Sequence, residues 1–373
     1  MEKILITPLV GLGDTLMMTP ALRLLKTHHP DFEITAVTLN RGCYDIIRNN
    51  PDIDRLRYFP LTTAGFGRGC AHILLHYSWK HTVSINFYPS NRAAYNLFSA
   101  LSFCPVRIGH RYLHNDLSQL NWLKNRTVRE DPRAHCVRQN VRLLKFLDNV
   151  FTAFDDDEMI PPMRVYLTGA EKEAGAQYRR MLGDGTVVGV HAGTSVFKGH
   201  GRRRWPKERF TELIDSLPDI RFVLFGTTED AEANEYIAAH VRNRAQVVTA
   251  ATATIREAAA IIGTLDAFVS NDSGLMHVAA AMETPVVAVL GPTNPDFIAP
   301  WKVRHRVVRT GLDCSPCFYY SPRPLRCTLD GSFRCLAELP AGMVGEALAA
   351  VLSDVGKRKS SPSRLPGVSS VSG

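Results

Sequence analysis

The chain has 373 residues, of which 45% are hydrophobic and 21% are charged, and its formal net charge is +8. This composition is typical of a soluble globular protein and excludes the fibrous and disordered classes, while the length predicts two domains because single cores stop growing near about 250 to 300 residues. No apolar run approaches the roughly 20 residues of a membrane-spanning helix and the first residues do not form a secretory signal, so we expect a cytoplasmic protein.

In the first half, apolar runs rich in valine and isoleucine alternate with helix-length segments, which is the pattern of parallel βα units. We predict strands over 3–9, 33–39, 55–59, 81–88 and 106–109, and helices over 15–29, 43–50 and 92–103. From Arg111 to Pro162 the chain is polar and irregular, except for a predicted helix over 137–151. The prolines at 161 and 162 indicate a linker.

The second half repeats the same pattern. We predict strands over 186–193, 220–226, 266–271 and 285–291, and helices over 169–182, 207–217, 230–241, 254–263, 274–282 and 342–355. The expected fold is therefore α/β, with two Rossmann-like doubly wound domains, residues 1–165 and 166–355, that face a central cleft. The Ser/Gly/Pro-rich residues 356–373 are predicted to be a disordered tail.

A glycine-rich turn with Gly11 and Gly13 follows the first predicted strand. The dinucleotide fingerprint G-x-G-x-x-G would require a third glycine where Leu16 stands, and no Gly-Lys-Ser/Thr closes the turn as in a P-loop. Both nucleotide motifs are therefore disfavoured. What remains is a tight strand-to-helix turn that carries one carboxylate, Asp14, toward the cleft.

Asp14 has two interpretations from the residues alone. Its carboxylate can cap the helix and offset the helix dipole, which is worth about 1 kcal/mol. An ionised carboxylate at a domain cleft can also accept a proton from an attacking hydroxyl group. The turn taken alone favours the cap, so the choice depends on the rest of the chain.

The stretch 268–295 predicts a strand, the turn 271–274 and a helix. Free backbone N–H groups in the first turn of that helix form an anion site, to which Gly274 allows close approach and Ser273 adds a hydroxyl group. His277 lies near the same helix start. Its alternative interpretation is a half-buried histidine with satisfied hydrogen bonds.

A basic loop precedes the helix predicted over 207–217. Arg202, Arg203 and Arg204 stand side by side before Trp205. Guanidinium groups bind phosphate oxygens in bidentate fashion, so this loop together with the anion turn favours a nucleotide diphosphate ligand. A solvated basic loop is the usual alternative. The net positive charge by itself also permits nucleic acid or anionic lipid headgroups as partners.

Four late cysteines form a C-x2-C pair followed by two single cysteines, at Cys314, Cys317, Cys327 and Cys335. Four thiolates suit tetrahedral zinc or iron, and a cytoplasmic location disfavours two disulfides. Two interpretations of this cluster stay open: a structural knuckle that ties a loop to the second domain, and a set of reduced, unliganded thiols. Whether a metal binds is not decided by the sequence.

The stretches 4–37, 191–214 and 269–295, together with the cysteine cluster, resemble glycosyltransferase family 9, the heptosyltransferases. The resemblance runs in order from Lys3 to about Leu352 and is weak between Gly65 and Arg133. It implies a GT-B fold and transfer of a heptose from ADP-heptose to a lipopolysaccharide core sugar, with inversion, no catalytic metal and no cofactor. A glycolipid or glycan acceptor implies peripheral contact with the inner face of the inner membrane, and nucleic acid has no role.

The resemblance also implies roles for particular residues. Asp14, after the turn glycines Gly11 and Gly13, would be the general base. Arg203 stands where many members have lysine and would bind the diphosphate and stabilise the leaving charge, although an arginine cannot act as a neutral amine. Donor-binding roles follow for Thr194, Ser195, Arg204, Glu229, Asp272, Ser273, Gly274 and His277.

The acceptor is expected on the first domain. Seven arginines could supply positive charge there for a phosphorylated or lipid-linked acceptor, although each is individually typical of a solvated surface: Arg92, Arg107, Arg111, Arg126, Arg129, Arg133 and Arg138. Rival functions are a catalytically silent nucleotide-sugar-binding protein, a transferase for another sugar or a protein acceptor, and an epimerase of GT-B shape.

Overall fold

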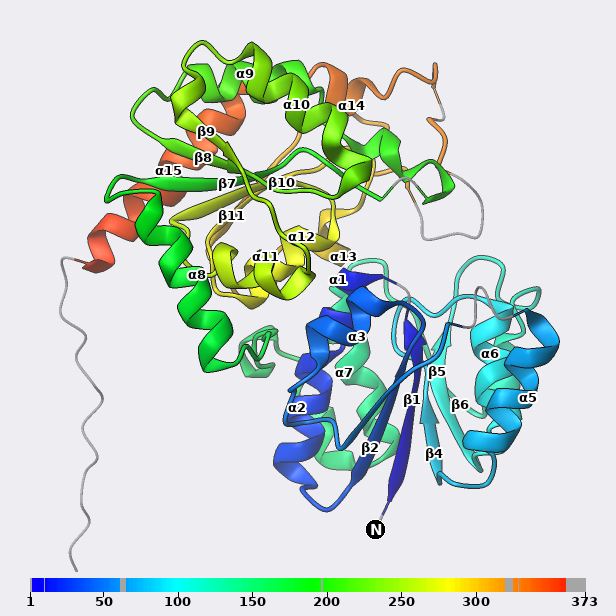
Figure 1. The fold of residues 1–373 in the computed structure, drawn as a ribbon. Coiled ribbons are helices and arrows are strands. Elements are labelled where there is room, and N and C mark those ends of the chain that lie inside the picture. The colour runs from blue at the N-terminus through cyan, green and yellow to red at the C-terminus, as the bar shows by residue number, and fades with distance from the viewer. Residues whose placement is uncertain are drawn as a thin grey trace, which may run out of the picture.

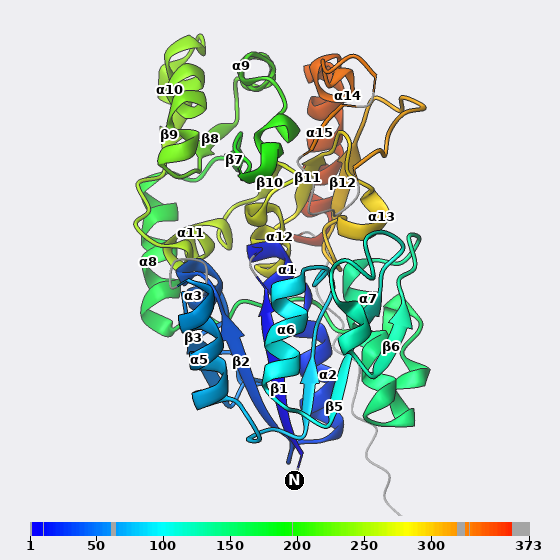
Figure 2. The same cartoon turned by 90° about the vertical axis from the view of Figure 1, so that its right-hand side faces the viewer.

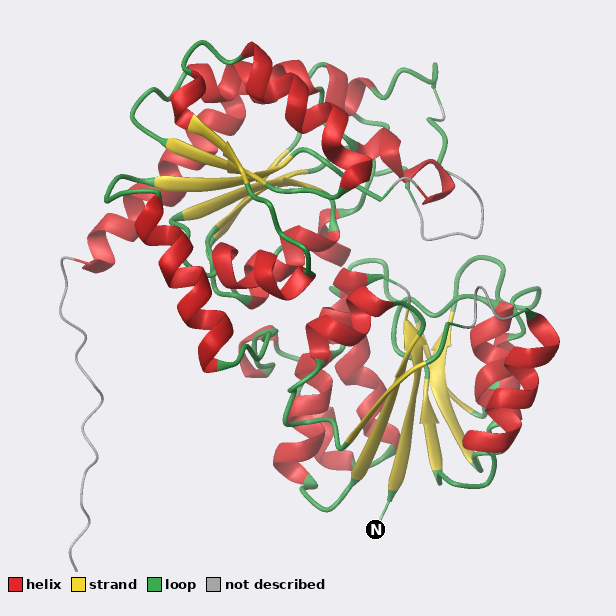
Figure 3. Ribbon diagram, in the orientation of Figure 1, coloured by secondary structure: helices red, strands yellow, loops and turns green. Residues whose placement is uncertain are grey.

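The computed structural model describes residues 2–9, 11–60, 65–195, 197–318, 325–327 and 329–359. Within these residues the strands form two parallel six-stranded sheets, each covered by helices on both faces (Figure 1 and Figure 3). The predicted two-domain, Rossmann-like α/β fold is confirmed.

The first sheet has the strand order β3-β2-β1-β4-β5-β6. Its strands are β1 (Lys3–Leu9), β2 (Glu33–Thr38), β3 (Arg55–Tyr58), β4 (Val83–Ile85), β5 (Val106–Arg111) and β6 (Arg126–Arg129). Its helices are α1 (Leu12–Met17), α2 (Thr19–His28), α3 (Arg41–Ile47), α5 (Phe66–His76), α6 (Ala93–Leu101) and α7 (Cys136–Arg142). The short 3-10 helices η1 (Asn121–Leu123), η2 (Leu143–Phe146), η3 (Asn149–Ala153) and η4 (Asp157–Met159) complete this half.

The second sheet has the order β12-β11-β10-β7-β8-β9. Its strands are β7 (Val187–His191), β8 (Arg221–Leu224), β9 (Val247–Thr249), β10 (Ala267–Asn271), β11 (Val286–Val289) and β12 (His305–Val308). Its helices are α8 (Gly169–Met181), α9 (Lys207–Asp215), α10 (Ala231–His240), α11 (Ile255–Ile262), α12 (Gly274–Ala281), α13 (Pro295–Ile298), α14 (Arg334–Ala337) and α15 (Ala341–Lys359). The 3-10 helices are η5 (Phe197–Arg203), η6 (Thr228–Asp230) and η7 (Arg244–Gln246).

Both sheets have the same doubly wound order, and in each the direction of winding reverses between the first and fourth strands. Ligands of open α/β sheets bind at such a switch point, beyond the carboxyl ends of the strands. In the first sheet the switch lies between β1 and β4, and in the second between β7 and β10. The turn with Asp14 follows β1, and the turn 271–274 follows β10, so both predicted site turns lie at switch points.

The structure corrects several predicted elements. The single helix predicted over 15–29 is two helices, α1 and α2, which join at Met18, where Pro20 lies at the start of α2 without an N–H to continue α1. Among the strands and α-helices of the described residues, those not predicted are α5, α13, α14 and the edge strands β6, β9 and β12. Helix α15 continues to Lys359, four residues into the predicted tail, and the rest of that tail lies outside the described residues.

The two domains meet along a shared core. One cluster of buried apolar side chains contains residues of both domains, among them Leu16 of α1 and Phe297 of α13. Figure 2 shows α1 lying directly beneath α12. None of the helices in the described part of the chain has the length and apolarity that crossing a membrane requires.

Candidate active site

The Asp14 turn is built on glycines that permit close approach. A Cβ atom added at Gly11 would lie 2.2 Å from the Asp14 Oδ2 atom, so the carboxylate folds back over its own turn. Gly11 is the N-cap of α1, and Asp14 lies in the first turn, where an acidic side chain is favourable. The capping hydrogen bond of the alternative interpretation is absent at this helix in the described structure, whereas the position of Asp14 in the first turn fits the favourable interaction with the helix dipole.

Helices α1 and α12 bring the turns of the two domains together. A Cβ atom at Gly13 would lie 2.4 Å from the His277 Cδ2 atom, and one at Gly274 would lie 3.0 Å from the Leu12 Cβ atom. The histidine ring of the second domain therefore covers a glycine of the first, and Leu12 of the first covers a glycine of the second. This reciprocal packing places Asp14 opposite the turn that contains Asp272.

The carboxyl group of Asp14 is half-buried between charges of both domains. Its pKa is raised from the ordinary 3.8 to about 7, chiefly by burial and in addition by repulsion from Asp272, while Arg203 and Arg92 act in the opposite direction. A carboxyl group with this pKa exists in both protonation states near neutral pH. It has the property required of a general acid or base at that pH.

Arg203 is a buried cation, 7% exposed, at the centre of the second-domain site. Its Nη1 atom donates to Asp272 Oδ2, and its Nη2 atom lies 3.2 Å from His200 Nδ1. The guanidinium group lies 5.7 Å from the ring centroid of Phe318. Asp272 also accepts a hydrogen bond of 2.5 Å from Thr293, so its position is determined from two sides and it orients Arg203.

A second polar network holds Arg204 beside Arg203. Arg204 Nη2 donates to the carboxylate of Asp230 at 2.7 Å and to the carbonyl oxygen of Thr194 at 3.0 Å. Asp230 lies 3.5 Å from His191 Nε2, and His191 Nδ1 is 2.8 Å from the hydroxyl oxygen of Ser273. The ends of β7, β8 and β10 are thereby linked through side chains.

Three buried nitrogen atoms at this site have no hydrogen-bond partner among the described residues: Arg203 Nε, Arg204 Nε and His277 Nδ1. Buried polar groups are nearly always paired, so unpaired donors beside a helix start indicate a place for a ligand or water oxygen. No side chain in the described structure caps the N-terminus of α12 either, since Ser273 bonds elsewhere. Burial lowers the pKa of His277 to about 4, so the ring is neutral at pH 7.

Comparisons with known proteins show the family and the fold of the chain. The family model described as glycosyltransferase family 9 (heptosyltransferase) matches residues 95–325. The chain belongs to glycosyltransferase family 9. It is 27% identical to lipopolysaccharide heptosyltransferase 2 of Salmonella typhimurium over 95% of this chain and 99% of that protein.

Solved structures show the same fold. This glycosyltransferase superposes on E. coli ADP-heptose lps heptosyltransferase II with a TM-score of 0.72 and 22% identity, over 95% of this chain and all of that one. E. coli heptosyltransferase WaaC with ADP gives a TM-score of 0.65 and 19% identity, over 94% of this chain and 99% of that one.

The remaining predicted donor residues of the glycosyltransferase have different surroundings. Thr194 is buried, and its hydroxyl group donates to the His200 carbonyl oxygen at 3.0 Å, whereas Ser195 is exposed. Glu229 is also exposed, and its carbonyl oxygen accepts from Arg204 at 3.3 Å. The buried carboxylate of this turn is that of the next residue, Asp230. The ligand-binding roles of these residues stay predictions.

Sequence analysis assigned no role to three residues that build the site: His191, Asp230 and Asn271. Asn271 donates to the Ala192 carbonyl oxygen at 2.7 Å and accepts from the Trp205 N–H at 3.0 Å, so it ties the basic loop to the strand ends. His191 and Asn271 are the last residues of β7 and β10, and Asp230 lies in η6, the 3-10 helix that follows β8. The rule that strand ends meet at the switch point could have identified them.

Three of the seven predicted acceptor arginines are bound to neighbouring groups of the first domain. Arg92 contributes to the field at Asp14. Arg111 pairs with Asp116, Arg138 pairs with Asp157, and Arg107 donates to the carbonyl oxygens of Leu123 and Cys104. Of these four, Arg92 alone interacts with a predicted catalytic residue.

The four late cysteines line one small cavity of about 10 Å³. All are free thiols, and burial together with the neighbouring thiols raises the pKa of Cys335 to about 11. Within the described ranges, no group of three or more His, Cys, Asp or Glu side chains is arranged to hold a metal ion. The cluster lies close to Arg203, since the Cys317 and Phe318 N–H groups both donate to the Pro292 carbonyl oxygen at 2.9 Å and the guanidinium group of Arg203 lies over the ring of Phe318.

Proposed function

We propose that this enzyme transfers a heptose from ADP-heptose to a hydroxyl group of a lipopolysaccharide core or related glycan acceptor, with inversion at the anomeric carbon and without a metal ion. The observation that supports it most directly is the meeting of Asp14 from one domain with Arg203 and Asp272 from the other. The names of the relatives supply the sugar and the acceptor class. In this proposal residues 1–165 bind the acceptor and residues 166–355 bind the donor.

In the proposed reaction, Asp14 accepts the proton of the acceptor hydroxyl group as that oxygen bonds to the anomeric carbon. The bond from the anomeric carbon to the diphosphate oxygen breaks on the opposite face, and its electron pair leaves with ADP. The pKa of about 7 suits this task, because a base near neutrality is ionised and still accepts a proton readily.

In the proposed donor site, positive groups stabilise the negative charge of the departing ADP. Arg203 and Arg204 can each donate through an Nε–H that the described structure leaves unpaired, so the ion pairs with Asp272 and Asp230 need not break. The uncapped N-terminus of α12 adds backbone N–H donors. We therefore assign charge stabilisation to these cations and this helix rather than to a metal ion, and Asp272 becomes the residue that orients Arg203.

The acceptor would enter from the first domain, with Arg92 beside Asp14 as the contact for an acidic group. A lipid-linked acceptor places the enzyme at the inner face of the inner membrane as a peripheral protein. The net charge of +8 favours that surface because its lipids are anionic.

A panel of nucleotide sugars tests the donor. A ligand that binds only the folded protein raises the unfolding temperature by mass action, so ADP-heptose should protect more than the UDP- and GDP-sugars. Release of ADP should then require both ADP-heptose and a lipopolysaccharide core acceptor. Equal protection by a UDP-sugar, or ADP release that is independent of the acceptor, would contradict the proposal.

A further inference from the structure

Arg256, in the first turn of α11, joins the two domains through a fully used guanidinium group. The residue is 1% exposed. Its Nη1 atom donates to the carbonyl oxygens of Asp45 at 3.0 Å and Arg48 at 3.2 Å, which belong to the end of α3 in the first domain. A cation at the C-terminus of a helix also interacts favourably with the helix dipole.

The other donors of Arg256 bind the start of α8 and residues 161–168, which begin with the two prolines, lead into α8 and are called the linker here. Nη2 donates to the Tyr166 carbonyl oxygen at 2.8 Å, and Nε and Nη2 make a bidentate pair with Glu171 at 2.6 Å each. All five N–H groups of the guanidinium thus have acceptors, which lie in α3, the linker and α8. A lysine has one nitrogen and cannot reach all of these acceptors.

Glu171 is held in place as firmly as its partner. Its carboxylate accepts from the Thr168 N–H at 2.7 Å in the capping box of α8, and from Arg48 of the first domain at 3.2 Å. Arg256 is the largest cause that holds the pKa of Glu171 well below its ordinary range. The pair therefore stays ionised, and it connects the start of the second domain to the end of α3.

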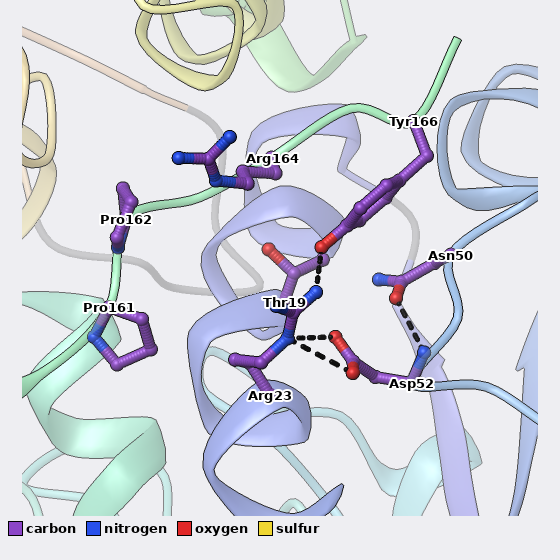
Figure 4. Close-up of a pocket in the computed structure, with 8 residues that line it drawn as sticks. All are labelled: Thr19, Arg23, Asn50, Asp52, Pro161, Pro162, Arg164 and Tyr166. Carbon is purple, nitrogen blue, oxygen red and sulfur yellow. Dashed lines mark hydrogen bonds and ion pairs between the residues drawn. The ribbon is translucent and has the colours of Figure 1, made fainter. Parts of the chain in front are cut away.

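The linker has a second anchor on the first domain. Figure 4 shows Tyr166 and Asp52 on either side of Arg23, around a cavity of about 30 Å³. Arg23 Nε lies 2.9 Å from the Asp52 carboxylate, and Nη2 donates to the Tyr166 hydroxyl oxygen. The side chain of Tyr166 thus binds the first domain while its carbonyl oxygen binds Arg256 of the second.

Helix α3 connects this junction to the candidate catalytic turn. Its C-terminal end is held by Arg256, and it packs against both α11 and α1. Cys43, in its first turn, is buried next to Thr15 of α1 and lies within the electrostatic reach of Asp14. The contacts of Arg256 are therefore transmitted through one rigid element to the turn that carries the proposed base.

We propose that Arg256, with Glu171, is a positioning residue that sets the orientation of the first domain and so places Asp14 opposite the donor site. The inference rests on the proposed function, since Asp14 is its proposed base. Arg256 itself touches none of the proposed donor-binding residues, all of which lie on the second domain. A change at Arg256 should therefore separate donor binding from transfer.

The test compares Arg256→Lys and Glu171→Gln with Glu173→Gln, a control on the same helix that removes an exposed pair with Arg180. ADP affinity, measured by calorimetry, should stay within about twofold of the wild type in all variants. The kcat at saturating donor should fall about 100-fold in Arg256→Lys, because a misplacement of about 1 Å costs that much, and less in Glu171→Gln. The control should keep the wild-type kcat.

Amide hydrogen exchange provides a readout that does not depend on the reaction. In Arg256→Lys, exchange should become faster in α1 and α3 and stay unchanged in β7 and β10. Equal losses of ADP affinity and kcat would overturn the inference, because Arg256 would then support the second domain alone. Unchanged exchange in α1 together with a wild-type kcat would also overturn it. If the wild type transfers no sugar, the proposed function fails, but faster exchange in α1 still supports the positioning role and unchanged exchange overturns it. If Arg256→Lys does not fold, the hydrogen exchange of α1 and the kcat of Glu171→Gln decide between the same outcomes.

Discussion

Replacing Asp14 with asparagine should abolish transfer and stabilise the protein at the same time. The carboxyl group has a pKa of about 7 in the folded protein and an ordinary value of 3.8, a difference of about 3. Since one pKa unit corresponds to about 1.4 kcal/mol, the ionised form lowers the free energy of unfolding by at most about 4 kcal/mol. We expect Asp14→Asn to recover about 1 to 4 kcal/mol at pH 8.

The sign and the pH window follow from linkage. An aspartate with a raised pKa binds its proton more tightly in the folded than in the unfolded chain, so the wild type loses stability as pH rises from about 4 to about 7. The neutral asparagine does not titrate. The advantage of the variant should therefore grow across this window and be constant above pH 7, whereas its kcat should fall by several orders of magnitude.

The assay is urea unfolding of the wild type and Asp14→Asn at several values between pH 4.5 and 8, with kcat and ADP affinity measured on the same preparations. Asp184→Asn, which removes an exposed carboxylate from a surface turn, serves as the control and should change neither the free energy of unfolding nor kcat nor the ADP affinity. A variant that keeps its activity would show that the base lies elsewhere. A variant that is no more stable than the wild type at pH 8 would refute the burial of the Asp14 charge.

Three further results are expected. The wild-type kcat should rise about tenfold per pH unit below pH 7 and level off above it, because only ionised Asp14 can accept the proton, and a flat profile from pH 5 to 8 would contradict its role. Arg203→Lys should weaken ADP binding about 10- to 100-fold in calorimetry, through the loss of charge-assisted hydrogen bonds, whereas the exposed neighbour Arg202→Lys should not; equal affinities would remove Arg203 from the site. Gly13→Ala should lower both kcat and the unfolding temperature, because its Cβ would lie 2.4 Å from the His277 ring. The double variant with His277→Ala should recover the unfolding temperature, and additive losses in the double variant would show that the two sites are independent.

How far the fold could be predicted differs between central and edge strands. The central strands β7, β10 and β11 are buried throughout, and their largely apolar runs are recognisable from the sequence. The edge strands β6, β9 and β12 are only partly buried, so their polar and apolar residues mix as they do in loops. The segment that contains β6 was for this reason predicted to be irregular.

The residues of the candidate site also differ in how far the sequence could predict them. Asp14 and Gly274 could be found because a strand, a glycine-containing turn and a helix are local in sequence. His191 and Asp230 could have been named as candidates from their positions after strands, but their contacts with each other and with Ser273 depend on the order of the strands in the sheet. Arg256 looks like an ordinary charged residue near a helix start, and nothing local indicates that five acceptors from three segments surround it.

The sequence by itself therefore determined the two Rossmann-like halves, the family and the two turns at Asp14 and at residues 271–274, because hydrophobic periodicity and glycine positions act over a few residues. Only the tertiary structure decided that Asp14 loses much of its solvation beside Asp272 and Arg203, and that a buried arginine joins the domains. The energy of a charge depends on what surrounds it in space, and these surroundings come from distant parts of the chain.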